Sequence, residues 1–137
     1  MVIARSVNET FSYVCKADRA LDASLQTTFR LRRLPSTVGI ALDNLHEGNA
    51  DGQVTLKVGD QKMVALMAGI DGWENFNDAE GNQVEFKRNA GERSVFGVIV
   101  KNPALRSMID HLPPDIADEL AAVIREENTV SEDDLKN

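Results

Sequence analysis

The sequence has little of several residue types that mark specialised chemistry or location. It contains one cysteine, Cys15, so no disulfide can form within the chain, and only two histidines. No stretch approaches the ~20 apolar residues of a membrane-spanning helix, and the opening Met1–Arg5 lacks the apolar run of a signal peptide. These absences predict a protein made in a reducing, intracellular compartment without a membrane partner. We expect Cys15 to be a small core residue.

Basic residues are also scarce relative to acidic ones. Fifteen Lys and Arg face twenty-two Asp and Glu, which gives a net charge of −7. Such a balance repels phosphate backbones, so nucleic acid is not expected as the main partner. The basic residues concentrate at Arg30, Arg32 and Arg33. We interpret them either as the solvated face of a strand or as a surface for an anionic partner, with Arg30 and Arg32 as candidate partner-binding residues.

The remaining composition is that of an ordinary globular domain. The chain has 137 residues, of which 42% are hydrophobic and 27% are charged, and this length suits one core. The predicted fold class is α+β, with small antiparallel hairpins packed against several helices. We expect a single domain over residues 1–126 and an acidic, frayed tail over 127–137.

Alternating apolar and polar residues predict the strands. Segments 10–15 and 27–34 both alternate in this way, and together they predict an N-terminal antiparallel hairpin. The polar cluster 78–82 is typical of a tight turn, and it predicts a second short hairpin within 73–87. Segment 53–58 is interpreted as a strand, with the start of a helix as the alternative.

Helices are predicted at 36–47, 60–68, 91–111 and 114–126. The last is the clearest, because proline and acidic residues occupy its first turn and apolar residues recur along one stripe. Within 91–111, the β-branched run 95–100 leaves a strand as the alternative. The expected core consists of Phe11, Tyr13, Phe29, Leu31, Val38, Leu42, Leu66, Trp73, Phe86, Phe96, Leu105, Ile109, Leu120 and Ile124.

The residue patterns of known catalytic and metal sites are missing from the sequence. His46 and His111 are far apart, and neither has a cysteine or a helical partner at metal-ligand spacing. The loop from Asp78 has Gln83 and Asn89 where an EF-hand requires glycine and glutamate. Nucleophile elbows and phosphate-binding loops are also missing. We therefore expect no enzyme, no catalytic residue, no cofactor and no metal site.

Two large rings, Trp73 and Phe76, lie beside glycines in an irregular segment. Rings in such a position serve as anchors of protein interfaces. The alternative is that Trp73, the only tryptophan, fills the core between sheet and helices. We keep both interpretations, with Trp73 and Phe76 as candidate partner-binding residues.

Several short motifs lie in order along most of the chain. They are Thr10-Phe11-x-Tyr13-Val14, Asp18-Arg19, Thr28-Phe29-x-Leu31-x-x-Leu34, Gly72-Trp73-Glu74-Asn75-Phe76, Asp78-Ala79-Glu80-Gly81-Asn82 and Phe86. Together with the helix over 114–125 and the polar ending 131–137, they resemble a group of small proteins from tailed-bacteriophage morphogenesis modules. Several proteins of that group are regarded as tail assembly chaperones.

The resemblance implies a viral protein in the host bacterial cytoplasm that binds phage tail or tape-measure proteins and shields them until assembly. Chaperones of that group are described as mainly helical, whereas the first third of this chain is rich in predicted strands. This departure leaves a second hypothesis, a self-associating structural virion subunit of the tail, connector or decoration type, whose strands add to a neighbour's sheet. The acidic charge suggests a third, a host-directed inhibitor.

Overall fold

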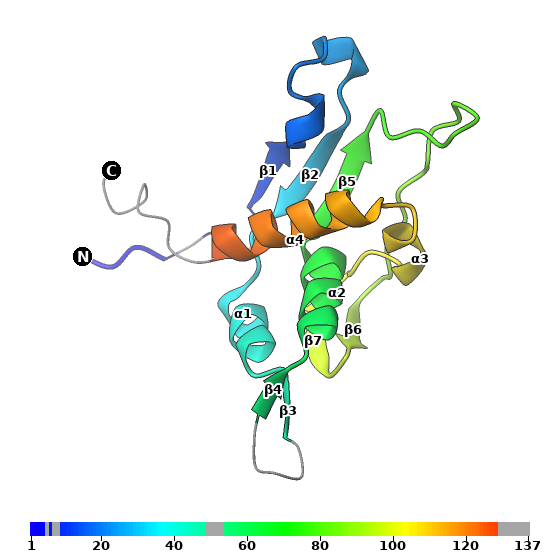
Figure 1. Cartoon of the computed structure of the whole chain (residues 1–137). Helices are drawn as coiled ribbons and strands as arrows, with labels where there is room; N and C mark the ends of the chain where they lie inside the picture. The colour runs from blue at the N-terminus through cyan, green and yellow to red at the C-terminus, as the bar shows by residue number, and fades with distance from the viewer. Residues whose placement is uncertain (5, 7–8, 49–53, 129–137) are drawn as a thin grey trace.

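The computed structural model describes residues 1–4, 6, 9–48 and 54–128 (Figure 1). The strands are β1 (Thr10–Tyr13), β2 (Thr28–Arg32), β3 (His46–Gly48), β4 (Val54–Leu56), β5 (Ile70–Glu74), β6 (Glu92–Val95) and β7 (Val98–Lys101). The α-helices are α1 (Ser36–Asp43), α2 (Val58–Gly69), α3 (Arg106–Ile109) and α4 (Pro114–Asn128), and two 3₁₀ turns, Lys16–Asp18 and Ala23–Leu25, separate β1 from β2. The α+β class is therefore confirmed.

The main sheet has three antiparallel strands in the order β1-β2-β5. Its register pairs Tyr13 with Phe29 and Phe29 with Trp73, so aromatic side chains lie side by side on one face. The predicted N-terminal hairpin is confirmed as β1 and β2. Between Arg30 and Leu31 the pairing with β5 shifts, and Asp71 is the extra residue of a β-bulge.

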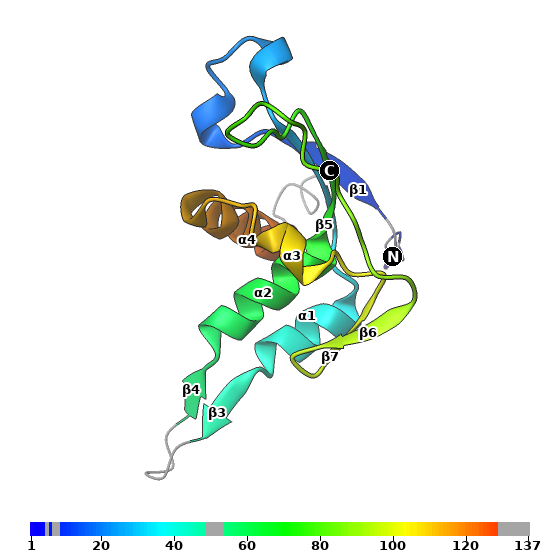
Figure 2. The same cartoon turned by 90° about the vertical axis from the view of Figure 1, so that its right-hand side faces the viewer.

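Helix α2 occupies the centre of the molecule and contacts α1, α3, α4, β2, β5 and β7. All its residues from Val64 to Gly69 are buried, because a helix surrounded by other elements must be apolar on every side. Helix α4 crosses one face of the main sheet and packs along α2 (Figures 1 and 2). The two helices approach closely at Gly69, where a Cβ atom would lie 2.6 Å from the side chain of Ile124.

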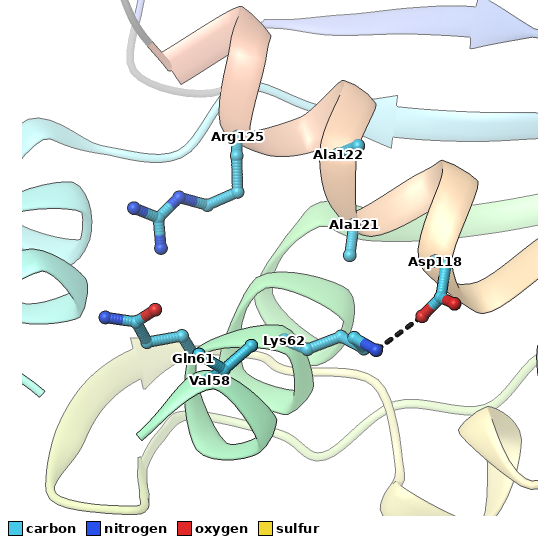
Figure 3. Close-up of a pocket in the computed structure, with 7 residues that line it drawn as sticks. All are labelled: Val58, Gln61, Lys62, Asp118, Ala121, Ala122 and Arg125. Carbon is cyan, nitrogen blue, oxygen red and sulfur yellow. Dashed lines mark hydrogen bonds and ion pairs between the residues drawn. The ribbon is translucent and has the colours of Figure 1, made fainter. Parts of the chain in front are cut away.

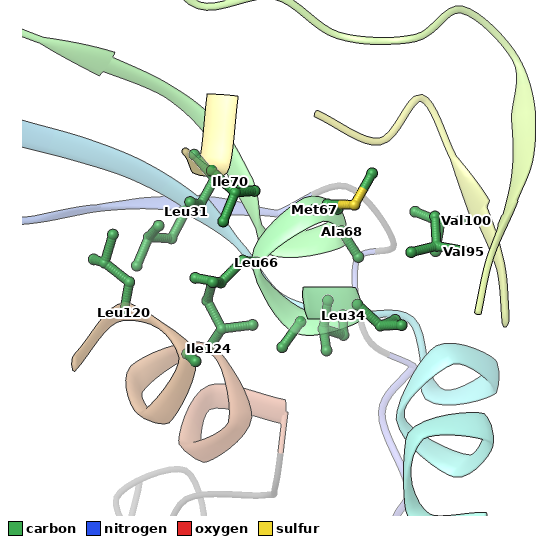
Figure 4. Close-up of a cluster of buried hydrophobic side chains, with 14 of the residues drawn as sticks. Leu31, Leu34, Leu66, Met67, Ala68, Ile70, Val95, Val100, Leu120 and Ile124 are labelled. Atoms are coloured by element: carbon green, nitrogen blue, oxygen red, sulfur yellow. The ribbon is translucent and has the colours of Figure 1, made fainter. Parts of the chain in front are cut away.

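The core forms where the sheet, α2 and α4 meet, around Leu31, Leu66, Leu120 and Ile124 (Figure 4). Nine of the predicted core residues are buried: Phe29, Leu31, Val38, Leu42, Leu66, Trp73, Ile109, Leu120 and Ile124. Phe11, Tyr13, Phe86 and Leu105 are partly buried against them. Cys15 is buried as predicted. Phe96 is the exception, since 42% of its surface is exposed.

The predicted helix 91–111 is wrong over most of its length. Residues 92–101 form the antiparallel hairpin β6–β7, and only Arg106–Ile109 are helical. The two residues at the tip of the hairpin, Phe96 and Gly97, have φ angles of 51° and 84°. These values fit a two-residue turn of type I′, which suits the twist of the strands. The turn directs Phe96 outward, which explains its exposure.

The predicted second hairpin within 73–87 forms only in part. The turn is present, because the Asp78 carboxylate accepts hydrogen bonds from the backbone N–H groups of Glu80 and Asn82 (3.0 and 2.9 Å). However, residues 84–87 form no strand, and only an isolated bridge joins Asn77 to Gln83. β5 pairs with β2 instead, where its aromatic residue, Trp73, meets Phe29.

Three other predicted helices have different bounds in the structure. Helix 36–47 ends at Asp43, and the following residues form β3, which pairs with β4 inside the predicted strand 53–58. Helix 60–68 is confirmed as α2, with about half a turn added at its start. Helix α4 continues past residue 126 to Asn128. The rest of the predicted acidic tail, 129–137, lies outside the described residues.

Candidate functional site

The candidate anchors Trp73 and Phe76 belong to an aromatic cluster. The ring of Trp73 lies 4.8 Å from Phe76, 5.0 Å from Phe86 and 6.2 Å from Phe29, in edge-to-face arrangements. Its indole N–H donates to the carbonyl oxygen of Val84 (2.7 Å). Only 7% of Trp73 is exposed. Trp73 therefore fills the core, as the second interpretation of the sequence held.

Phe76 remains partly accessible at the end of this cluster. It lies beside a cavity of about 170 Å³ between the first 3₁₀ turn, β2 and the start of α4. The lining residues are Cys15, Asp18, Thr27, Phe29, Phe76, Pro113 and Ile116. Burial, followed by the charges of Glu119 and Asp18, raises the pKa of Cys15 to about 12. The thiol thus stays protonated near neutral pH, which makes it a poor nucleophile.

The two candidate arginines have different surroundings. Arg30 is exposed, and its Nε lies 3.4 Å from the Asp71 carboxylate, which also pairs with Arg88 (2.9 Å). Arg32 is half-buried, and it donates to the backbone carbonyls of Ala68 (2.6 Å) and Lys101 (3.2 Å). Arg32 thus ties β2 to α2 and β7. Of the two, only Arg30 presents most of its side chain to a partner.

A groove of about 650 Å³ lies between β1, the first 3₁₀ turn and α4. At one end the Tyr13 hydroxyl donates to Glu119 (2.5 Å), and the backbone N–H of Lys16 donates to the same oxygen (3.0 Å). Arg19 lies 5.5 Å above the Tyr13 ring and donates to its hydroxyl oxygen (3.3 Å). Phe11, Ala122 and Val123 supply the apolar part of the groove.

The pKa values in this groove follow from the same contacts. Burial, and then the hydrogen bond to Glu119 and its charge, raises the pKa of Tyr13 to about 12. For Glu119, desolvation alone would raise the pKa. The hydrogen bonds from Tyr13 and Lys16 and the charges of Lys16 and Arg19 outweigh desolvation and hold the pKa below its usual value. Glu119 is therefore a carboxylate near neutral pH, and Tyr13 is its donor.

A second groove, of about 340 Å³, lies on the other side of α4, against α2 (Figure 3). Val58 and Ala121 supply its apolar floor, and the charged ends of side chains from both helices form its rim. On that rim, Lys62 pairs with Asp118, as the dashed line in Figure 3 shows. Arg125 pairs with Asp43 of α1 (2.9 Å). Asp118 and Ala122 line both grooves, so they form a ridge between them.

Sequence reasoning did not select any of the residues of these two grooves as functional. Their residues come from four separate elements, and no motif connects them. The one signal present in the sequence is Ala122, an apolar residue that lies on the otherwise charged outer face of α4 and is exposed. The grooves form only because the fold brings β1 and α2 to opposite sides of α4.

The described residues show no metal-ligand cluster and no helix suited to a bilayer. Within those ranges, no three His, Cys, Asp or Glu side chains gather closely enough to hold a metal ion. No described helix combines the length and apolar character needed to cross a membrane.

Comparison with known proteins adds no relative. No protein-family model matches the chain, and neither a curated protein nor a solved structure matches it.

Proposed function

We propose that this chain acts by binding other proteins, as a bacteriophage tail assembly chaperone in the cytoplasm of the infected bacterium. The observation that carries the binding role is the pair of grooves on either side of α4, with the exposed Ala122 on the ridge between them. Apolar floors with polar rims are typical of surfaces that hold a segment of another protein.

The ion pairs on the rim of the groove between α2 and α4 also favour reversible binding. Lys62 pairs with Asp118 and Arg125 pairs with Asp43, so the charges beside the floor are neutralised before a partner arrives. Such exposed pairs contribute little to stability, and a partner can replace them at small cost. An assembly factor requires this property, because it must release its client when the tail subunits assemble.

The phage assignment is supported by the resemblance described above. Residues that carry it, Phe29, Trp73, Phe76 and Phe86, pack into one aromatic cluster, and the 78–82 turn lies between the last two. Their spacing in the sequence therefore corresponds to one structural unit. Proteins with a common architecture would share residues that form the core in this way.

The test is affinity purification of the tagged chain from infected bacteria, combined with a proteomic inventory of purified virions. We expect capture of a tail or tape-measure protein, and absence of this chain from virions. Stoichiometric presence in virions would overturn the chaperone role and would support the structural subunit. Failure to capture any tail protein would overturn both.

A pair of variants tests whether the grooves are the binding surface. Ala122→Arg places a large charged side chain on the ridge between the grooves, and we expect it to reduce capture at least tenfold without altering circular dichroism. The matched control is Ala79→Arg, which makes the same change on the exposed 78–82 turn, outside both grooves. Equal capture by the two variants would exclude the grooves.

A further inference from the structure

The cavity beside Phe76 is separate from the two grooves that flank α4. Its volume is about 170 Å³, and none of its seven lining residues also lines a groove. Cys15 and Phe29, which are 3% and 2% exposed, lie at its base. Phe76 and Ile116 are half-buried and form walls nearer the surface. The cavity is thus a pocket with a buried base and an accessible mouth.

The walls of this pocket suit an aromatic ring. Five of the seven lining residues are apolar or carry a protonated thiol: Cys15, Phe29, Phe76, Pro113 and Ile116. The rings of Phe29 and Phe76 lie 5.6 Å apart at an angle of 58°, so a third ring can pack edge-to-face against them. An apolar cavity of about 150 Å³ is large enough to bind benzene. The pocket therefore has room for one small ring system.

One charged group lies among these apolar walls. The Oδ2 atom of Asp18 accepts a hydrogen bond from the backbone N–H of Thr27 (2.9 Å). Within the part of the chain that the structure describes, no group donates to the other carboxylate oxygen, Oδ1. The Thr27 hydroxyl already donates to the carbonyl oxygen of Asn75 (2.8 Å). The pocket thus has an unused carboxylate oxygen that can accept a hydrogen bond from a ligand.

The surrounding charges show which ligand this oxygen would accept. Glu119 and Arg19 also act on Cys15, and their charges shift the pKa of its thiol in opposite directions. Both of them are engaged with the Tyr13 hydroxyl in the groove between β1 and α4. An anionic ligand would be repelled by the Asp18 carboxylate. A neutral N–H or O–H donor avoids this repulsion and the cost of burying a charge, and it gains a hydrogen bond to a charged acceptor.

We propose that this pocket binds one neutral aromatic ring system that carries an N–H or O–H donor, such as indole or phenol. The ring lies between Phe29, Phe76 and Ile116, and the donor bonds to the Oδ1 atom of Asp18. The same chemistry occurs in a free small molecule and in a tryptophan or tyrosine side chain of another protein. Because the pocket shares no lining residue with the grooves, the inference is independent of the proposed function.

The first test is a titration of the purified full chain with indole, followed in the NMR spectrum of the protein. We expect saturable shifts of the Thr27, Phe76 and Ile116 signals, with a Kd of about 1 mM or tighter. The absence of saturable shifts at an indole concentration of about ten times this value would overturn the proposal. Shifts confined to Ala122 and its neighbours would place the ring in the grooves and would also overturn it.

Benzofuran tests the hydrogen bond to Asp18, because it has the shape of indole but carries a ring oxygen in place of the N–H group. We expect indole to bind about fivefold more tightly than benzofuran, since only indole can donate to the carboxylate. Asp18→Asn should abolish this preference. The amide can keep the bond from Thr27 through its oxygen, and it then presents N–H groups to the ligand. Equal binding of the two ligands by the natural chain, or an unchanged preference in Asp18→Asn, would overturn the proposal.

A second variant tests the space itself. Ile116→Trp fills the pocket with a ring from the protein, and we expect it to weaken indole binding about tenfold or more. The matched control is Ile40→Trp, the same substitution at an exposed position of α1 outside the pocket. Circular dichroism checks that both variants remain folded, and the Asp18→Asn comparison does not depend on either. Unchanged indole binding by folded Ile116→Trp would overturn the proposal.

The two sources of the ring are distinguished with N-acetyltryptophanamide, in which indole is attached to a peptide backbone. We expect it to bind as tightly as indole, because the pocket opens to the surface beside the exposed Pro113. This result would assign the pocket to an aromatic side chain of another protein. Clearly weaker binding than that of indole would assign it to a free small molecule.

Discussion

The two edges of the main sheet are built from similar strands but have different surroundings. Both β1 and β5 are short and carry an aromatic residue that faces the helices. Beside β5, the Arg88 guanidinium donates to the bulged Asp71 carbonyl (2.6 Å), and the chain at Val84 accepts a hydrogen bond from Trp73. Beside β1, the described part of the chain provides one comparable contact, from Arg19 at the end of the strand. Neighbouring segments therefore contribute to the protection of β5.

The bulge at Asp71 contributes to this difference. An extra residue leaves the ladder, so its carbonyl and carboxylate require other partners. Arg88 and Arg30 supply them. The covered edge therefore consists of a bulge, an ion-pair network and an aromatic cluster, whereas the open edge is a regular strand beside a groove.

The largest expected effect distinguishes the aromatic residues of the two edges. Trp73→Ala should lower the free energy of unfolding by ~3–5 kcal/mol, because a nearly buried ring leaves a cavity beside Phe29 and Phe86. Phe11→Ala, on the open edge, should cost about 1 kcal/mol, since the ring is only half-buried. Chemical denaturation at low protein concentration measures both. Equal losses would mean that the β5 edge is no better packed than the β1 edge.

The second-largest effect is expected in the layer of helices that packs against the main sheet. Gly69→Ala should destabilise the fold by ~1–3 kcal/mol, because the new methyl group would meet the buried side chain of Ile124 at 2.6 Å. The matched control is Gly59→Ala on the same helix, where nothing lies within 4 Å of the added atom. There we expect up to about 1 kcal/mol of stabilisation from helix propensity. Thermal melting would show opposite shifts, and shifts of the same sign would contradict the close packing of α2 and α4.

A smaller effect is expected from removing the protection of β5. Arg88→Ala should cost about 1 kcal/mol, because its ion pair with Asp71 is partly screened by solvent. It should also increase amide hydrogen exchange along β5 but not along β1. Arg93→Ala is the control, since Arg93 is exposed and its guanidinium donates a hydrogen bond to the carbonyl of the adjacent Glu92, away from β5. Unchanged exchange in β5 would show that Arg88 does not cover this edge.

The smallest effect tests the groove beside the open edge. The pKa of Glu119 is lowered in the folded state, so its stabilising contribution is complete above the usual value of 4.5 and is lost as the pH falls below it. Glu119→Gln should therefore lose less than about 1 kcal/mol near neutral pH and almost nothing in acid. Melting temperatures from pH 7 to pH 3 would show this convergence. Glu85→Gln, an exposed control, should run parallel to the wild type, and parallel curves for Glu119→Gln would contradict the contact with Tyr13.

Local patterns predicted the regular parts of the fold. The alternation around Phe29 predicted the β1–β2 hairpin, and the stripe that includes Leu120 and Ile124 predicted α4. A strand over 95–100 was only the alternative to the predicted helix, and the hairpin β6–β7 was not predicted, because its turn contains Phe96 at positive φ, a position at which asparagine or glycine is the usual signal. The pairing of β5 with β2 joins segments about forty residues apart, and local periodicity carries no information about such a choice.

The candidate site was predicted less well than the fold. Trp73 and Phe76 were selected for their size and Arg30 and Arg32 for their charge, but the structure uses Trp73 and Arg32 for internal contacts. The groove between β1 and α4 depends on Tyr13 lying next to Glu119, more than a hundred residues later in the chain. Spacing along the chain cannot predict a contact of this kind.

The sequence by itself determined the acidic charge, the α+β class and the amphipathic helix α4, since each follows from composition or from contacts between near neighbours. The tertiary structure decided which strands became neighbours, which edge was covered and which face of α4 was flanked by grooves. These outcomes depend on the packing of distant segments around the buried second half of α2, residues 64–69, whose entirely apolar sequence does not show which element meets each of its sides.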